Sequence, residues 1–147
     1  MAIVVHMHPS VTRHRPYGAK EARIFLNDVL PAAPDIPVQI AHLTGAGGYD
    51  DPAVDEALAV FVEAIRRRDS RMAHLYFDVS GIGQWVEKGT LLASRIRQIG
   101  LGRVLYGSDC SGSGNLSPKE AWAAFRQVSL SDSEFRTIEK NIAPYMK

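Results

Sequence analysis

The chain has 147 residues, of which 46% are hydrophobic and 22% are charged, as expected for a single folded domain spanning residues 1–147. The 17 basic and 16 acidic residues leave a net charge of +1, which argues against nucleic acid or an anionic membrane surface as a partner. The apolar runs are too short to span a bilayer. A single cysteine, Cys110, cannot form an internal disulfide, so we expect a cytoplasmic protein.

Short β-rich segments alternate with longer segments of helical periodicity along the chain. The predicted strands are 3–7, 38–43, 74–79 and 103–106. The predicted helices are 17–30, 52–68, 84–99, 118–128 and a last helix that begins at a capping box of Ser131 and Glu134 and runs toward Tyr145. The predicted apolar faces consist of Ala22, Phe25, Leu26 and Val29 in the first helix, and of Leu91, Leu92, Ile96 and Ile99 in the third.

Strands separated by helices predict a parallel sheet with right-handed crossovers. A closed eightfold barrel needs about 250 residues, so four such units correspond to half of a (β/α)8 TIM barrel or to a small open α/β sheet. Only Met1 and Ala2 precede the first predicted strand, which indicates a fragment or a late start. We expect segments 3–7 and 103–106 to be the two open edges of the sheet and to promote self-association.

Three polar residues, His6, His42 and Asp109, each follow an apolar run at the end of a predicted strand. The carboxyl ends of parallel strands meet at one edge of the sheet, so these side chains can converge. Two imidazoles and one carboxylate suit a divalent metal such as Zn²⁺. A single histidine in such a place is more often a hydrogen-bonded residue, but the matching positions of all three favour a site.

Other candidates lie around this cluster. His8 is two residues after His6, so it faces the same side of a strand and offers a further metal ligand, unless the chain has left the strand before Pro9. Arg13 lies in a predicted loop beside His14, where it is either solvated or able to bind an anionic substrate. His74 opens its strand at the opposite end and is predicted to be structural.

The loops after the second and fourth strands are rich in glycine. Gly45, Gly47 and Gly48 lie between a strand and a helix, but Asp50 stands where the dinucleotide-binding pattern requires a third glycine. Neither this loop nor 111–115 carries the lysine of a phosphate-binding P-loop. Both are better explained as loops that can cover a site.

Four segments carry a resemblance to a known family: Val4-Val5-His6-Met7-His8-Pro9, Ile40-Ala41-His42-Leu43-Thr44-Gly45, Tyr76-Phe77-Asp78-Val79-Ser80-Gly81 and Arg103-Val104-Leu105-Tyr106-Gly107-Ser108-Asp109. In this order they resemble the C-terminal half of metal-dependent hydrolases of the amidohydrolase superfamily. The most similar branch is the amidohydrolase-related one, with aminocarboxymuconate-semialdehyde decarboxylase and 2-pyrone-4,6-dicarboxylate lactonase. The ending 141–145 resembles the last helix of that family.

The resemblance implies that the four strands are strands five to eight of a barrel. It implies that His6 binds a metal and that His42 either acts on the substrate or binds the metal. Asp109 would be a metal ligand that also takes a proton from the bound water, and Ser80 would contact substrate. The family's first strand, whose His-x-His pair supplies two further metal ligands, has no counterpart in the chain.

The expected function is therefore that of a metal-dependent hydrolase or decarboxylase acting on a small carboxylate-bearing substrate, with activity impaired in the isolated half. Zn²⁺ would lower the pKa of a bound water to about 7, Asp109 would take its proton, and His42 would polarise the substrate carbonyl. Two alternatives remain open: a non-catalytic half-barrel that has lost its metal, and a small α/β module that binds an anion at loop 45–48.

Overall fold

The structure, a computed structural model, describes residues 2–7, 17–45, 52–82, 87–110 and 115–146. Its single sheet consists of β1 (Ile3–Val5), β2 (Val38–Ile40), β3 (Leu75–Asp78) and β4 (Val104–Leu105). All neighbouring strands are parallel, and their spatial order is the order of the chain. Within the described residues β1 and β4 are the edges, so the predicted parallel α/β sheet with these two edges is confirmed.

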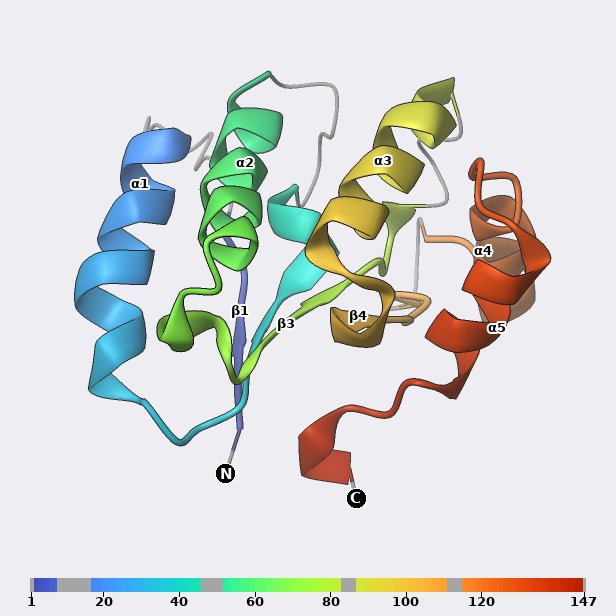
Figure 1. Ribbon diagram of the computed structural model, residues 1–147. Helices are drawn as coiled ribbons and strands as arrows, with labels where there is room; N and C mark the ends of the chain where they lie inside the picture. The colour runs from blue at the N-terminus through green and yellow to red at the C-terminus, as the bar shows by residue number, and fades with distance from the viewer. Residues whose placement is uncertain (1, 8–16, 46–51, 83–86, 111–114, 147) are drawn as a thin grey trace.

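Helices connect the strands and cover one face of the sheet (Figure 1). The first is α1 (Ala19–Ile24), which continues as a π-helical segment, Phe25–Val29, and a 3₁₀ turn, Leu30–Ala32. The others are α2 (Pro52–Arg66), α3 (Gly89–Ile99), α4 (Pro118–Phe125) and α5 (Asp132–Lys140). Short 3₁₀ turns occupy Ala41–Thr44, Ser70–Met72, Leu101–Arg103 and Pro144–Met146.

The core lies between this helical layer and the sheet. Alternate strand residues face the helices, and those that are buried on this face are Val38, Ile40, Leu75, Phe77 and Val104. Phe61 of α2 packs edge-on between Phe25, with ring centroids 6.2 Å apart, and Phe77, at 5.7 Å. This stack joins the π-helical segment after α1, α2 and β3 into one apolar unit.

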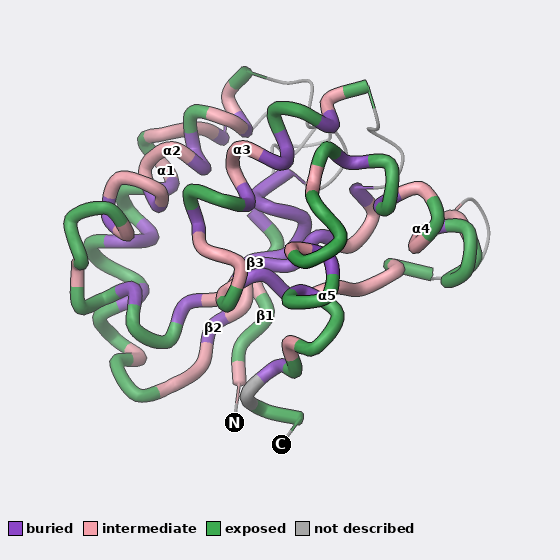
Figure 2. Tube along the Cα trace, turned by 45° about the vertical axis from the view of Figure 1, so that its right-hand side comes forward, coloured by how far each residue is buried: buried purple, intermediate pink, exposed green. Residues whose placement is uncertain are grey.

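The other face of the sheet has a different character. Val4, Gln39 and Tyr76 lie side by side in register on this face, followed by Asp78 beside Leu105. Val4 is 49% exposed, and Figure 2 shows β1 exposed at the edge while β3 is buried inside the sheet. Gln39, Tyr76 and Asp78 make this face polar. The candidate site residues lie at the carboxyl ends of the same strands.

Several predicted boundaries are wrong. The second strand ends at Ile40 rather than at residue 43, because His42, Leu43 and Thr44 all have positive φ angles. Val29 is 51% exposed although an α-helix would bury it, since the π-helical segment changes the direction of the side chains that follow. Leu91 is also exposed rather than on the buried face of α3.

The two C-terminal helices are shorter than predicted. The helix expected over 118–128 ends at Phe125, and α5 ends at Lys140 because Asn141 is extended. The capping box of Ser131 and Glu134 is confirmed. Ser117 and Glu120 form a second box of the same kind at the start of α4.

Candidate functional site

The structure brings His6 and His42 together at the carboxyl ends of the neighbouring strands β1 and β2. Their ring centroids are 5.1 Å apart, and the ring planes are tilted by 55°. His6 is exposed, whereas His42 is only 9% exposed. The pairing follows from the parallel register, in which Val5 lies beside Ile40 and the two chains leave the sheet at the same level.

His42 lies in a strained backbone turn. Its φ of 54° is followed by 47° at Leu43 and 72° at Thr44, a left-handed run that costs roughly 1–2 kcal/mol per residue for side chains other than glycine. Hydrogen bonds hold the turn: the amide of His42 donates to Asp78 Oδ1 at 2.9 Å, and the amide of Gly45 donates to the His42 carbonyl at 2.7 Å. Such strain persists only where the surroundings over-determine it, which is common at functional sites.

The ring of His42 is fixed by Ser80, which follows β3. Nδ1 is 2.8 Å from the Ser80 carbonyl oxygen and 3.0 Å from Ser80 Oγ. A carbonyl oxygen can only accept a hydrogen bond, so this contact requires a proton on Nδ1, and in a neutral ring Nε2 then keeps its lone pair. Histidines that bind a metal are commonly held in this way, with the second ring nitrogen donating to a carbonyl.

Asp78, the last residue of β3, helps to hold both the backbone turn at His42 and, through Ser80, the ring of His42. Its side chain is buried, with 4% exposed, and it accepts hydrogen bonds from His42 N, Ser80 N, Ser80 Oγ and Gln39 Nε2. Gln39 in turn accepts a hydrogen bond from Tyr145 Oη. From the sequence alone, Asp78 is predicted only to be part of a strand. The signal that could have identified it is a carboxylate at the end of an apolar strand, two residues before Ser80.

Asp109 follows β4 and shares a small space with His42. A Cβ atom on Gly81 would lie 3.4 Å from Asp109 Oδ2 and 3.5 Å from His42 Nδ1, so both groups border Gly81. Gly81 has a φ of +70°, which a glycine adopts without strain. Asp109 also has a positive φ, of 55°, and its backbone carbonyl accepts a hydrogen bond from Asn115 Nδ2. Its carboxylate is exposed at the edge of the cluster.

The remaining predicted residues are placed as follows. Ser80 contacts His42 and Asp78, so its hydroxyl supports the site residues. His74 is exposed at the opposite, amino-terminal end of β3, where its carbonyl accepts a hydrogen bond from the amide of Val38, as expected for a structural residue. His8 and Arg13 lie outside the described residues, and Cys110 is exposed.

Tyr17 is a further buried polar residue near the turn of His42. Burial raises the pKa of its phenol to about 12, and the hydroxyl of Thr44 opposes this shift with a smaller effect. Thr44 Oγ1 itself donates to the carbonyl of Val54 at 3.2 Å, which ties the turn after β2 to the first turn of α2. The phenol therefore stays protonated at neutral pH.

The residues at the strand ends fit a metal ion only in part. Two imidazoles on one tetrahedral zinc, with Zn–N near 2.0 Å, would place their ring centroids about 5 Å apart. The 5.1 Å between His6 and His42 agrees with this distance. However, no group of three or more His, Cys, Asp or Glu side chains within the described ranges is arranged to hold a metal. The described residues thus offer two ligands and do not complete a site.

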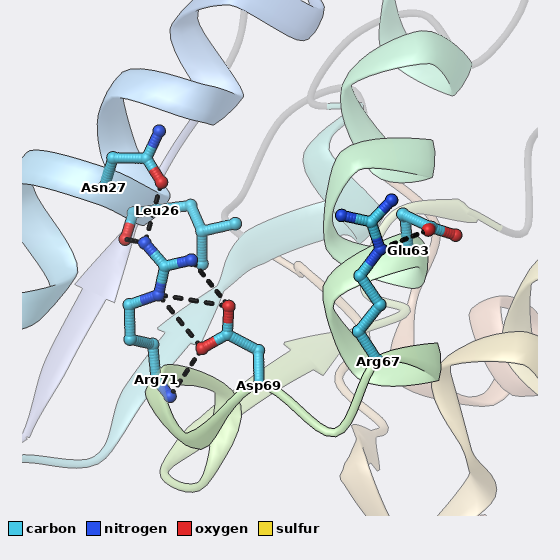
Figure 3. A network of polar contacts seen from close by, with 6 residues as sticks. All are labelled: Leu26, Asn27, Glu63, Arg67, Asp69 and Arg71. Carbon is cyan, nitrogen blue, oxygen red and sulfur yellow. Dashed lines mark hydrogen bonds and ion pairs between the residues drawn. The ribbon is translucent and has the colours of Figure 1, made fainter.

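Two cavities lie away from this cluster. One, of about 450 Å³, is a groove between α1 and α2, and the other, of about 350 Å³, lies at the amino-terminal ends of the strands beside His74. Two of the arginines that line the groove form ion pairs, Arg67 with Glu63 and Arg71 with Asp69. Arg71 also donates to Asn27 Oδ1 and to the Leu26 carbonyl, and so joins the π-helical segment after α1 to the turn before β3 (Figure 3).

Comparisons of the chain with protein-family models, with curated proteins and with solved structures give no match. None of the helices in the described part of the chain combines the length and the apolar character that crossing a bilayer requires.

Proposed function

We propose that the chain is the half of an amidohydrolase-like (β/α)8 barrel that contains strands five to eight. In this proposal His6, His42 and Asp109 belong to the active site of a metal-dependent hydrolase or decarboxylase that acts on a small carboxylate-bearing substrate. The observation that carries the proposal is the state of His42. Its Nδ1–H is held by the Ser80 carbonyl, its Nε2 is left as a lone-pair donor, and the ring of His6 lies beside it.

The position of the proton on the His42 ring limits the chemical roles that this side chain can have. A neutral imidazole with its proton on Nδ1 presents Nε2 as a proton acceptor or metal ligand. It cannot donate a hydrogen bond through Nε2 to polarise a substrate carbonyl, the role expected from the resemblance. In the proposal His42 therefore accepts a proton or binds the metal, and the exposed carboxylate of Asp109 is the second acceptor at the same strand ends.

A divalent ion would supply a polarised water molecule when bound. It would need at least one ligand beyond His6 and His42, since the described residues form no group of three. His8, which lies outside the described residues, and Asp109 are the candidates for that ligand in this proposal; the exposed carboxylate of Asp109 would have to move toward the two imidazoles to bind the same ion. We assign no reaction step to the metal, because the described residues do not complete its coordination.

The two open edges of the sheet, β1 and β4, are surfaces at which the chain can associate with a partner. β1 and β4 each pair with a single strand in the described sheet, and Ile3 and Val4 on β1 are exposed. Unpaired edges of this kind favour association with another chain. We propose that copies of the chain associate through these edges, and that the protein works in the reducing cytoplasm, where the exposed thiol of Cys110 would remain free.

A second candidate is a half-barrel without catalytic activity. It is favoured by one observation, the lack of a third metal ligand among the described residues. The two candidates differ in whether the purified chain binds a divalent metal at all.

Titration calorimetry with Zn²⁺ tests the proposal. The unmodified chain is expected to bind zinc weakly, and His6→Ala is expected to abolish the binding because it removes one of two imidazoles. His74→Ala is the matched control, since this exposed histidine lies at the other end of the sheet. Zinc binding that survives His6→Ala, or that is lost equally in both variants, would place the site elsewhere. An unmodified chain that binds no zinc would favour the non-catalytic half-barrel.

A further inference from the structure

Asp78 is a buried carboxylate that no lysine or arginine of the described residues neutralises by an ion pair. A buried charge is costly unless hydrogen bonds compensate it. Its four partners all act as donors: two backbone amides, one hydroxyl and one side-chain amide. An acceptor-only pattern suits an ionised aspartate, so the site contains a negative charge held entirely by hydrogen bonds.

The two oxygens of Asp78 have different partners. Oδ1 accepts from His42 N at 2.9 Å, from Ser80 N at 3.1 Å and from Ser80 Oγ at 2.5 Å. Oδ2 accepts from Gln39 Nε2 at 2.6 Å. One oxygen therefore joins the backbone turn after β2 to the residue that follows β3, and these are the two segments that meet at the ring of His42.

These contacts form a chain of hydrogen bonds from the ring of His42 through Ser80 to Asp78. The hydroxyl proton of Ser80 points to Asp78, so the lone pairs of Ser80 Oγ are free to face the ring, and Nδ1–H of His42 donates to them and to the Ser80 carbonyl. The direction of each hydrogen bond is set by the carboxylate, which can only accept. Charge-assisted hydrogen bonds are roughly twice as strong as neutral ones, which makes Asp78 the anchor of the chain of contacts.

We propose that Asp78 is the positioning residue of the site: it holds the left-handed turn at His42 and, through Ser80, keeps the proton of the ring on Nδ1. The inference rests on the proposed function only in treating His42 as a site residue. The three atoms nearest to a Cβ on Gly81 belong to His42 and Asp109, whereas Asp78 contacts the backbone of His42 and Ser80, so we infer that Asp78 acts through His42.

Gln39 extends the network to the C-terminal turn. Its Nε2 donates to Asp78, so its Oε1 faces Tyr145 and accepts from the phenol. The neutral side chain of an Asp78→Asn variant can be accommodated by this arrangement. The amide of Gln39 would turn over, Oε1 would accept from the new amide nitrogen, and the phenol oxygen of Tyr145 would accept from Nε2. The conservative variant can thus keep the three contacts of Oδ1, whereas alanine cannot.

The test is the tautomer of His42, measured by the ¹⁵N chemical shifts of its ring in NMR spectra of the whole chain. In the unmodified protein we expect protonated Nδ1 and unprotonated Nε2. Asp78→Ala is expected to give a mixture of tautomers, and Asp78→Asn is expected to keep the proton on Nδ1. Asp28→Ala, which removes an exposed aspartate from the π-helical segment, is the matched control and is expected to change nothing at His42.

Two outcomes would overturn the proposal. One is a folded Asp78→Ala variant, checked by circular dichroism, in which the His42 tautomer is unchanged. The other is an unmodified protein whose His42 carries its proton on Nε2. This result would refute the proposed role of Asp78 even if Asp78→Ala does not fold. Neither readout uses zinc. A chain that binds no zinc but shows the expected tautomers would refute the proposed function and leave the role of Asp78 intact.

Discussion

The π-helical segment after α1 makes a prediction about two apolar residues that a plain α-helix would treat alike. In a straight α-helix Val29, seven residues after Ala22, would lie about 20° from it, at the centre of the buried face. In the structure Ala22 and Phe25 are buried, with 0% and 9% exposed, while Val29 is 51% exposed. We therefore compare Phe25→Ala with Val29→Ala.

The expected magnitudes differ widely. Phe25 packs on Phe61, and Phe→Ala in a core costs about 3–5 kcal/mol because the removed ring leaves a cavity. Val29→Ala removes two carbons that are largely in water, so its cost stays within about 0.5 kcal/mol. If the helix were α-helical throughout and Val29 buried, the same change would cost about 2 kcal/mol, from about 0.8 kcal/mol per buried carbon and the cavity left behind.

Urea unfolding followed by circular dichroism, with the unmodified chain as reference, measures both costs. Each variant should be unfolded at two protein concentrations, because association of copies through the π-helical segment would bury Val29. A cost of Val29→Ala near 2 kcal/mol that does not depend on concentration would show that the π-helical segment is wrong. A cost that disappears on dilution would instead place Val29 at a contact between copies.

Three further results are expected. Gly81→Ala should destabilise the fold by roughly 1–2 kcal/mol, because the φ of +70° is unfavourable for alanine, whereas Gly102→Ala, where nothing lies within 4 Å of an added Cβ, should change urea unfolding little. Hydrogen bonds from Arg97 and from the backbone of Ser131 lower the pKa of Glu134 from 4.5 to about 2. The contribution of Glu134 to the free energy of unfolding is therefore complete above pH 4.5 and is lost as the pH falls toward 2. Glu134→Gln should reduce the pH dependence of the unfolding free energy over that range, and an unchanged pH dependence would contradict this. Light scattering should show a mass that rises with concentration, and a clean monomer at high concentration would count against association through β1 and β4.

The order and direction of the strands could be predicted because they depend on local patterns. Apolar runs alternate with helical periodicity, and a strand–helix–strand connection of this length favours parallel pairing. The meeting of His6 and His42 follows from the same argument, since the ends of neighbouring parallel strands share one edge. Both predictions need only the identity of the elements and their order.

The end of β2 could not be predicted because it depends on a distant residue. The segment from Val38 to Leu43 reads as one β-rich run, yet the strand ends at Ile40. The amide of His42 donates to the side chain of Asp78, 36 residues away, rather than to the backbone of the neighbouring strand. Propensity does not record such a contact, and tertiary structure routinely overrides it. The same holds for Val29, whose exposure follows from one π-helical turn.

One feature of the sequence, the polar residue Gln39 within the apolar strand β2, does point to the network that supports the site. A parallel sheet covered on both faces has strands that are apolar almost throughout. Gln39 interrupts the run of β2, Tyr76 and Asp78 interrupt that of β3, and the register places all three on the face of the sheet opposite to the core. Since a buried polar group needs partners, polar residues at matching positions of adjacent strands predict a network across that face. The hydrogen bond between Gln39 and Asp78 belongs to the network that holds His42. Two of the residues that interrupt the apolar pattern of the strands therefore identify the support of the site, while the residues that follow the strands identify the site itself.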